Sequence, residues 1–439
     1  MDLLRDTPVP GFSLNRPNKK SLPIPEPPRT QTVEYYCYYV ITVVTVSYMI
    51  YVGYVVSSQK TFLDPLYKFD LSDNQWSNFR SNLPILIIVM GLFVAINRFT
   101  ILYNNNPTGN SLYARLSGQP DSYSRPEKDV YVSNKPFNLR ADNQMMIVGM
   151  AIFSTIFLCV VFGFSIIFIM LIISLNYYLA VHVFAGTKFG YFGIFSFNMG
   201  VLFMNEIYRG YSFGSISPSM AWMDNHRGIF TRWDVTFNIT MLRMVSFGLD
   251  YHWKVLQTPI LGEKKMLVLA SQSKLTEKQR LEYSRFDADY NFLNYFVYLT
   301  YVPLYMTGPI ITYNDFVYQI KTKHTSSQIS ISPRYIATYF ARLLFSFLTM
   351  ETMLHVVHPV AISEARAFTS LSPLQISLVG YFYLTFIWLK LLLIWRLARA
   401  FTLLDGLFVI ENMGRCMSNN YSLSDFWKEW HRSYNRFLV

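Results

Sequence analysis

The sequence predicts an all-α, polytopic membrane protein, a helix bundle of about eight spans with re-entrant or interfacial helices. Hydrophobic residues make up 52% of the 439 residues and charged residues only 15%, whereas a soluble chain carries about a quarter charged residues. The apolar residues also gather in long runs. A helix needs roughly 20 residues to cross about 30 Å of hydrocarbon, and these runs are long enough.

Seven runs are expected to span, and the third is long enough for two crossings. They are Tyr35–Val56, Pro84–Tyr103, Met145–Phe184, Tyr191–Ile207, Tyr290–Tyr313, Tyr335–Val357 and Ile376–Phe401. Residues 1–34 are rich in Pro, Asn and Lys, so we expect a flexible polar tail that buries no core. Residues 35–439 are then the membrane core.

The net charge is +11. In a soluble protein this excess would favour nucleic-acid binding. Here the Lys and Arg residues lie in the connections, so we expect anionic lipid head groups as partners and no nucleic acid. Cys37, Cys159 and Cys416 are far apart in the sequence, which argues against a disulfide framework.

Two segments are neither clear spans nor clear loops. Arg232–Trp253 has apolar residues at helical spacing but carries four charged residues, which is too many for contact with lipid. We predict an interfacial or protein-buried helix there. Leu403–Asn420 is predicted to be a loop or a re-entrant segment that leads into the closing helix.

The closing stretch "SLSDFWKEWHRSYNRFLV" predicts one helix with Ser424 as N-cap. Its aromatic face would hold Trp427, Trp430, Tyr434, Phe437 and Leu438. His431 would lie at the margin of that face, with Asn435 one turn on. The pattern fits an interfacial helix with an aromatic belt. It also fits a chemical role for His431, because histidine titrates near neutral pH.

Glu351, His355 and His358 follow i, i+4, i+7 spacing and so line one face of a predicted span. Ionisable groups within a span suggest function. One helix offers poor geometry for a metal, so we predict no metal site. A proton path or acid/base site, or a Glu–His hydrogen bond that fixes packing, both remain as interpretations.

Gly308-Pro309 interrupts an apolar run and predicts a helix break. Such a break is tolerated in a membrane only where the freed backbone is buried in protein or faces a cavity. The pair therefore marks either the wall of a functional cavity or a packing kink.

Five ordered blocks together suggest a family: "RWDVTFNITMLRMVSFGLDY", "YMTGPIITYNDFVYQ", "METMLHVVH", "ENMGRCMSNNYS" and "FWKEWHRSYNRF". The last resembles the FWxxWHxS-type signature of the membrane-bound O-acyltransferases (MBOAT). The set is similar to the fungal glycerol-uptake-protein branch, whose relatives include hedgehog acyltransferase. The resemblance runs from about residue 205 to residue 439.

This resemblance implies an MBOAT-type bundle that takes acyl-coenzyme A as co-substrate and a lyso-lipid or glycosylphosphatidylinositol (GPI) anchor as acceptor. It implies a multi-pass protein of the endoplasmic reticulum membrane, with the plasma membrane as the alternative. His431 matches one of the family's two polar active-site positions, and we assign catalytic roles to His431 and Asn435. Cys416 matches a cysteine that is reported to ligate haem in the hedgehog acyltransferase relative, although we favour a loop cysteine or a palmitoylation site over a haem ligand.

Two other classes compete with the enzyme. A transporter for glycerol or another polyol would need paired, broken spans around a midplane site. Gly308-Pro309 is one such break, but the sequence shows no mirrored partner. A non-catalytic, truncated homologue is the third class, because the family's second histidine is expected after a further membrane segment and the printed chain ends at Val439.

The two-histidine hypothesis gives a first prediction. The 439-residue polypeptide made as such should transfer no acyl chain, because His431 would have no partner to act as the base. The measurement is the transfer of a labelled acyl chain by the purified polypeptide. Detectable transfer would refute the hypothesis that a second histidine is required.

Overall fold

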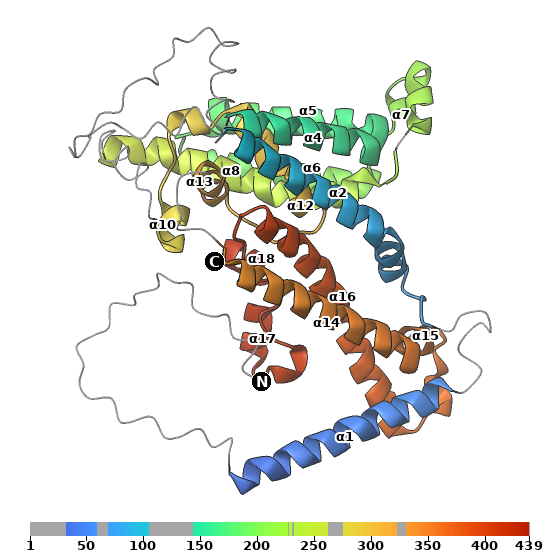
Figure 1. Ribbon diagram of the computed structural model, residues 1–439. Coiled ribbons are helices and arrows are strands. Elements are labelled where there is room, and N and C mark those ends of the chain that lie inside the picture. The colour runs from blue at the N-terminus through green and yellow to red at the C-terminus, as the bar shows by residue number, and fades with distance from the viewer. Residues whose placement is uncertain are drawn as a thin grey trace, which may run out of the picture. The chain divides into compact units, whose positions relative to one another are not determined.

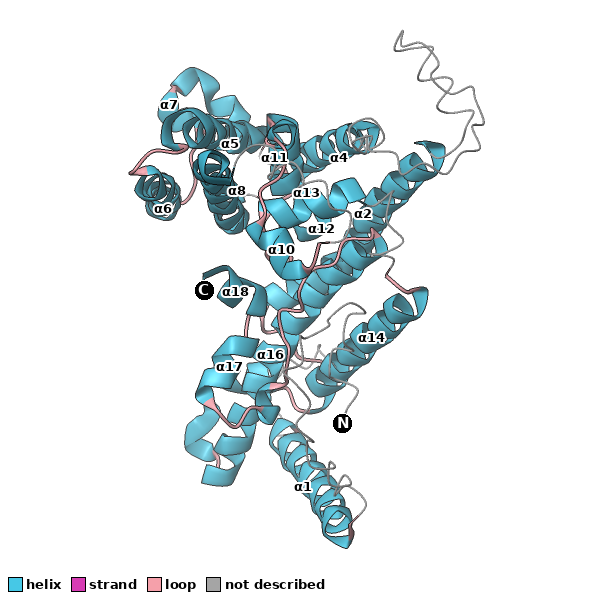
Figure 2. Ribbon diagram, turned by 90° about the vertical axis from the view of Figure 1, so that its left-hand side faces the viewer, coloured by secondary structure: helices cyan, strands magenta, loops and turns pink. Residues whose placement is uncertain are grey.

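The computed structural model (Figure 1) describes residues 32–58, 69–104, 144–226, 228–230, 232–261, 275–322 and 331–438. Within these ranges every regular element is a helix, and the only strand-like pairing is an isolated antiparallel bridge between Met413 and Trp430 (Figure 2). The all-α prediction is therefore confirmed. The predicted polar tail lies almost wholly outside the described residues and stays a prediction.

Among the described residues, eight helices are longer than twelve residues. They are α1 (Val33–Ser57), α2 (Asn74–Asn104), α4 (Gln144–Phe162), α5 (Ile166–Tyr178), α6 (Gly190–Tyr208), α8 (Trp233–Leu261), α14 (Pro333–Val356) and α16 (Pro373–Leu404). The shorter α-helices are α7 (Phe213–Ile216), α10 (Glu277–Glu282), α11 (Phe292–Thr300), α12 (Val302–Tyr305), α13 (Tyr313–Thr322), α15 (Pro359–Glu364), α17 (Leu423–Glu429) and α18 (Arg432–Leu438). Among the 3-10 helices are η3 (Gly163–Ser165), η5 (Pro218–Asn225) and η9 (Met417–Asn419), and η4 (Leu179–Phe184) is a π-helix.

Four described segments are helical, long and apolar enough to cross a membrane. They are Val33–Ser57, Asn74–Leu102, Gln144–Phe184 and Pro373–Leu404. Each coincides with a run that we expected to span. The run Gln144–Phe184 is divided into α4 and α5 by η3, where Gly163 has a left-handed backbone (φ 55°). The predicted span Tyr290–Tyr313 is instead a series of short helices.

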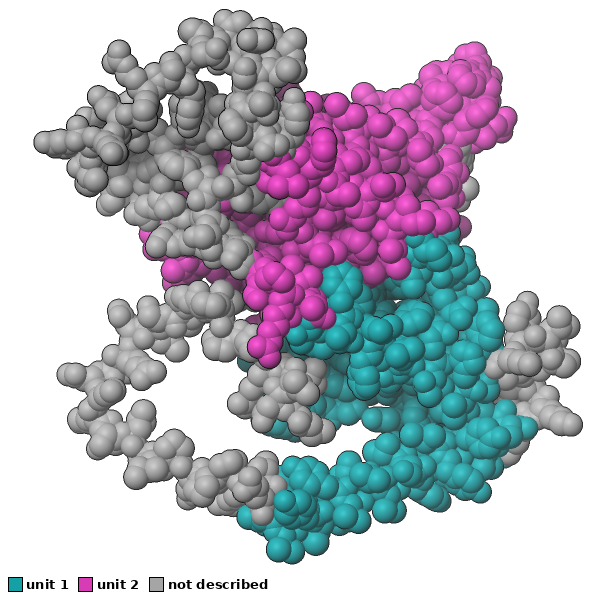
Figure 3. All heavy atoms as spheres, in the orientation of Figure 1, with its two compact units in different colours: residues 1–84, 338–396, 413–430 teal, residues 85–337, 397–412, 431–439 magenta. Residues whose placement is uncertain are grey.

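The chain forms two compact units (Figure 3). Unit 1 comprises residues 1–84, 338–396 and 413–430, and unit 2 comprises residues 85–337, 397–412 and 431–439. The core of unit 1 gathers around Trp76, which is fully buried against Phe79 and Phe347. The core of unit 2 is larger and rich in tyrosine, and the rings of Tyr295, Tyr298 and Tyr301 each contact another aromatic ring.

Helix α8 is the central element of unit 2. It contacts α5, α6, α11, α12 and α13. Its buried face includes Phe237, Met244 and Phe247 beside Arg243 and Asp250. The protein-buried alternative for residues 232–253 is thus confirmed, since three of its four charged residues, Asp234, Arg243 and Asp250, are buried in protein, and only Arg232 at its start is exposed.

In unit 1, the carboxylate of Asp70 holds the start of α15. Its Oδ2 accepts the backbone N–H groups of Val360 and Ala361, each at 2.9 Å, and its Oδ1 accepts that of Ser72 at 3.1 Å. The first N–H groups of a helix have no partner within the helix. Asp70 therefore serves as a cap from nearly three hundred residues away, and its side chain is fully buried.

Replacing Asp70 by Ala should lower the free energy of unfolding by about 1–3 kcal/mol, because buried N–H groups lose their acceptor. The measurement is thermal unfolding of the purified chain in a neutral detergent. Asp425→Ala is the matched control, since Asp425 is 43% exposed and its ion pair with Lys428 is long, at 3.8 Å. Equal losses in the two variants would contradict the capping role.

Candidate functional site

The predicted break at Gly308-Pro309 is confirmed. α12 ends at Tyr305 and α13 begins at Tyr313, so residues 306–312 connect two short helices. A Cβ atom on Gly308 would lie 2.4 Å from the Cα of Leu304, so this close approach of the backbone requires glycine. The segment from α11 to α13 is called the interrupted helix below.

Three polar side chains of α8 pair with backbone groups of the interrupted helix. The Arg243 guanidinium donates to the carbonyl of Leu299 at 3.1 Å and to that of Leu304. Ser246 Oγ accepts the N–H of Tyr313 at 3.1 Å, and Asp250 Oδ2 accepts the N–H of Asn314 at 3.0 Å. Positions 243, 246 and 250 lie on one helix face. The freed backbone is thus buried in protein and hydrogen-bonded, as the break requires.

The α8 cluster is also electrostatically unusual. Burial raises the pKa of the Asp250 carboxyl to about 7, although the N–H groups that it accepts act in the opposite direction. Burial lowers the pKa of Arg243 to about 10, so the guanidinium keeps its charge at neutral pH. Asp250 therefore changes its charge near physiological pH in the middle of the unit 2 core.

The closing segment is two short helices, and our prediction of one helix is wrong. Trp430 is extended (ψ 122°) and His431 is left-handed (φ 49°), so α17 and α18 are separate. The N-cap of α17 is Ser422 rather than Ser424, and its Oγ accepts the N–H of Asp425 at 3.3 Å. The aromatic face predicted for a continuous helix does not extend across this turn.

Pairing with the loop 405–420 explains the interruption. In unit 1, Met413 and Trp430 form a β-bridge, which requires extended backbone at Trp430. In unit 2, the carbonyl of Asn412 accepts the N–H of Arg432 at 2.9 Å, and its side-chain Oδ1 accepts the N–H of Ser433 at 3.3 Å. These contacts override the helical preference of the local sequence.

His431 occupies the turn between the two helices. A left-handed backbone is uncommon for a residue with a side chain and suggests a site where function or strong neighbouring contacts determine the conformation. The ring is half-buried and meets the ring of Tyr434 edge-on, with centroids 5.4 Å apart. Burial lowers the pKa of His431, which favours the neutral imidazole at physiological pH.

The second predicted site residue, Asn435, lies on the first turn of α18. Its N–H donates to the carbonyl of His431 at 3.1 Å. The structure thus brings the backbones of His431 and Asn435 together, and both side chains are half-buried. Their assignment to catalysis stays a prediction.

Ser433 joins α18 to the interrupted helix. Its Oγ accepts the N–H of Ile310 at 2.9 Å, directly after Gly308-Pro309. We did not single out Ser433 or Asn412 from the sequence. Both lie in quoted blocks, Ser433 as the serine of the WHxS pattern and Asn412 in "ENMGRC", so their place in those blocks was the available signal.

A buried ion pair fixes the loop that carries Asn412. Arg399 on α16 donates to Glu411 at 3.0 Å and to the carbonyl of Val409 at 2.7 Å. The side chains of Arg399 and Glu411 are 3% and 7% exposed, so removal of either partner would leave a buried charge. Arg399 and Glu411 therefore hold the acceptor that orders the start of α18.

Glu351, His355 and His358 do not form one cluster. The Glu351 carboxylate takes both a 2.8 Å and a 3.0 Å hydrogen bond from the guanidinium of Arg80. His355 Nδ1 contacts the carbonyl of Glu351 at 2.6 Å, and its ring stacks on Phe69. His358 is buried and left-handed at the start of α15. The Glu–His hydrogen bond that we considered is therefore present, but it uses the backbone carbonyl of Glu351, and the Glu351 side chain pairs with Arg80 instead. No group of three His, Cys, Asp or Glu suited to a metal occurs in the described ranges.

The surroundings of Cys416 do not fit a haem. The side chain is half-buried at the start of η9, and its neighbours Arg415, Ser418 and Asn419 are exposed. A thiolate-ligated haem needs an enclosing apolar pocket. We derive no chemistry through haem.

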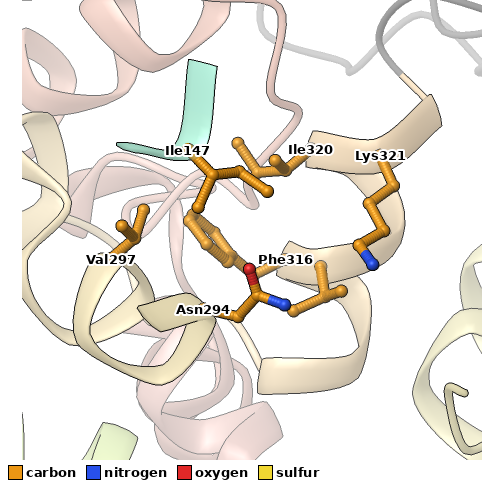
Figure 4. A pocket seen from close by; sticks show the side chains of 7 residues that line it. Ile147, Asn294, Val297, Phe316, Ile320 and Lys321 are labelled. Carbon is orange, nitrogen blue, oxygen red and sulfur yellow. The ribbon is translucent and has the colours of Figure 1, made fainter. Parts of the chain in front are cut away.

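A small pocket lies between α4, α11 and α13 (Figure 4). Ile147, Val297, Phe316 and Ile320 supply apolar walls, and Asn294 and Lys321 supply polar groups. Its volume of about 10 Å³ is enough for about one water molecule. Lys321 also pairs with Asp289. This pocket is therefore too small to be the substrate site.

The sequence is similar to known membrane proteins over the residues that form this site. The family model of the membrane-bound O-acyltransferases matches residues 216–439, which include α8, the interrupted helix and the His431 turn. The chain is 35% identical to the membrane-bound O-acyltransferase GUP1 of Saccharomyces cerevisiae over 96% of this chain and 71% of the relative. It is 34% identical to gup1 of Schizosaccharomyces pombe, over 85% and 58% respectively, and 33% identical to GUP1 of Candida tropicalis, over 94% and 65%.

Asp250 gives a prediction about pH. In the folded chain its carboxyl keeps a proton up to a pH of about 7, and in an unfolded chain only up to its ordinary value of 3.8. The folded state holds more protons between these values, so stability should fall as the pH rises through this window, by at most about 1.4 kcal/mol per pH unit.

Asp250→Asn keeps an oxygen acceptor for the N–H of Asn314 but does not titrate. Its melting temperature should therefore fall less than that of the unchanged chain between about pH 5 and about pH 7. Melting curves of both proteins in one detergent across this range make the comparison. Identical pH profiles would show that Asp250 does not titrate there.

Proposed function

The chain belongs to the membrane-bound O-acyltransferase family, and from this premise we propose that it transfers a long acyl chain from acyl-coenzyme A to a lipid hydroxyl. The proposed acceptor is a lyso-lipid, in the remodelling of GPI anchors in the endoplasmic reticulum membrane. The chain spans 58–71% of the three relatives described above, so the activity, substrates and location are proposals for the whole protein.

The reaction needs two kinds of help. The acceptor oxygen attacks the thioester carbon, the C–S bond breaks, and coenzyme A leaves as a thiolate that takes up a proton. A base must remove the proton of the acceptor hydroxyl, and donors must stabilise the oxyanion that forms. We assign His431 to binding and orienting the acceptor hydroxyl, and a second histidine, expected from the family resemblance, to the role of base.

The geometry of the His431 turn is the observation that supports this assignment. A neutral imidazole can accept a hydrogen bond from a hydroxyl, and burial favours that neutral form. The turn is held by Asn412 on one side and by Ser433 bound to Ile310 on the other. Groups that act on a substrate must be held within a fraction of an ångström, and these contacts provide that restraint.

The transporter alternative is weakened at both features on which it depends, the proton path and the helix break. A transporter could use Glu351, His355 and His358 as its proton path, but the Glu351 carboxylate is paired with Arg80. The break at Gly308-Pro309 is occupied by protein groups from α8 and α18. The acyltransferase is therefore the function that the described residues support best.

In the full-length protein, replacement of His431 by Ala or Asn should lower acyl transfer by about 10²-fold, because the acceptor hydroxyl would lose the group that orients it. Asn is the sharper test because it tolerates left-handed backbone and keeps the turn. The measurement is transfer of a labelled acyl chain from acyl-coenzyme A to a lyso-lipid, with membrane insertion and melting temperature as checks on folding.

His226→Ala is the matched control, since His226 is an exposed histidine on the loop after η5. Its activity should equal that of the unchanged protein. Retained transfer in His431→Asn would assign the turn to structure alone. Absence of transfer in the unchanged full-length protein, with several acyl lengths, would favour the non-catalytic homologue.

A further inference from the structure

A polar pocket lies at the end of α6, in a part of unit 2 that the proposed reaction does not use. Its volume is about 320 Å³, within the range of sites that bind small molecules. The eight lining residues come from η3, the end of α6 and the connection after it, α7, and the start of α8: Ser165, Tyr208, Arg209, Gly210, Tyr211, Ser212, Ser215 and Trp233.

One wall is aromatic. The rings of Tyr208 and Tyr211 have centroids 6.4 Å apart, and those of Tyr211 and Trp233 have centroids 5.8 Å apart. Trp233 is buried, whereas Tyr208 is 60% exposed, so the wall runs from the interior to the surface. Serine and tyrosine hydroxyls among the lining residues can donate and accept hydrogen bonds. Flat apolar faces beside hydroxyl groups suit a ring that carries hydroxyls.

Arg209 alone among these lining residues carries a charge at neutral pH. It ends α6 with a left-handed backbone (φ 50°), and Gly210 follows it with φ 82°. Glycine is the residue that adopts this conformation without strain. A strained, exposed arginine at the mouth of a pocket is an outlier that suggests a function, and its guanidinium suits a phosphate.

The carboxylates of Asp234 and Asp224, near the pocket, already have partners. Asp234 takes a 2.7 Å hydrogen bond from Arg232, and Asp224 accepts the N–H groups of Phe213 and Gly214 at 3.0 and 2.8 Å. These contacts satisfy both carboxylates with groups of the protein. Neither carboxylate lines the pocket, so the charge of Arg209 is the one that the lining presents to a ligand.

Exposed apolar side chains lie close to the lining residues: Ile207 precedes Tyr208, Ile216 follows Ser215, and Trp222 lies on η5, which packs against α7. Ile207 is 70% exposed, Ile216 65% and Trp222 55%. α7 and η5, which carry the last two, project beyond the ends of α4 and α5 (Figure 1). Exposed Trp and Ile beside a polar site are typical of a surface that meets the boundary between acyl chains and head groups.

We propose that this pocket binds the head group of an anionic phospholipid with a cyclic polyol, of the phosphatidylinositol class. The single negative charge of the phosphodiester faces Arg209, the ring lies against Tyr208 and Tyr211, and the serine hydroxyls bind the ring hydroxyls. The acyl chains extend over Ile207 and Ile216. The site does not depend on the acyl transfer proposed above.

The test titrates the purified full chain, in neutral detergent, with dioctanoyl phosphatidylinositol and follows 1:1 complexes by native mass spectrometry. Saturable binding is expected, at least about tenfold tighter than that of dioctanoyl phosphatidylcholine, because a charge-assisted bond is lost with the zwitterion. Arg209→Asn should weaken binding by about tenfold, since Asn accepts left-handed backbone but has no charge. Tyr208→Ala should weaken it severalfold through the lost ring contact.

Arg366→Asn is the matched control, because Arg366 is also exposed and left-handed (φ 49°) but lies in unit 1. Its affinity should be unchanged. Glycerophosphoinositol and inorganic phosphate separate a lipid site from a soluble phosphate site. Phosphate binding as tight as the lipid, equal affinity for phosphatidylcholine, or an Arg209→Asn affinity equal to that of Arg366→Asn would each overturn the proposal.

Discussion

The backbone between α11 and α13 leaves the helical conformation inside a protein core, and the polar face of α8 supplies its partners. A buried N–H or carbonyl without a partner costs about 1–3 kcal/mol, and α8 satisfies four such groups through Arg243, Ser246 and Asp250. That total is comparable with the whole net stability of a domain, about 5–15 kcal/mol. The rest of unit 2 therefore depends on α8 keeping these three side chains directed toward the interrupted helix.

The same requirement extends to the closing segment. Ile310 lies in the break, and its N–H finds its acceptor on Ser433 of α18. Helices as short as α17 and α18 are not stable on their own, so α18 is ordered by what it contacts. Arg399 binds Glu411, and the next residue, Asn412, accepts the N–H of Ser433 at the start of α18. His431 thus sits between a loop fixed by a buried ion pair and a backbone fixed by α8.

Hydropathy and turn chemistry are local, and what depends on them was predictable. The four apolar helices, the break at Gly308-Pro309 and the buried character of α8 all follow from neighbouring residues. The partners of Glu351 and of the α15 N-terminus do not. Arg80 lies 271 residues before Glu351, and Asp70 lies 290 residues before Val360. Spacing along one helix could not show that the Glu351 carboxylate faces an arginine rather than His355.

His431 shows the same limit from the other side. A helical wheel placed it at the margin of an aromatic face, but that face requires a continuous helix and α17 ends before it. The His431 side chain belongs to no helix face, and its backbone conformation is the reason. A left-handed residue between two helices projects its side chain independently of either helix face, and its direction is then set by the neighbouring contacts. Those contacts, at Asn412 and Ser433, belong to the unit 2 core. A backbone turn fixed by core contacts rather than by a helix surface keeps its direction when the surrounding lipid changes, and the orienting role that we propose for His431 requires such a fixed turn.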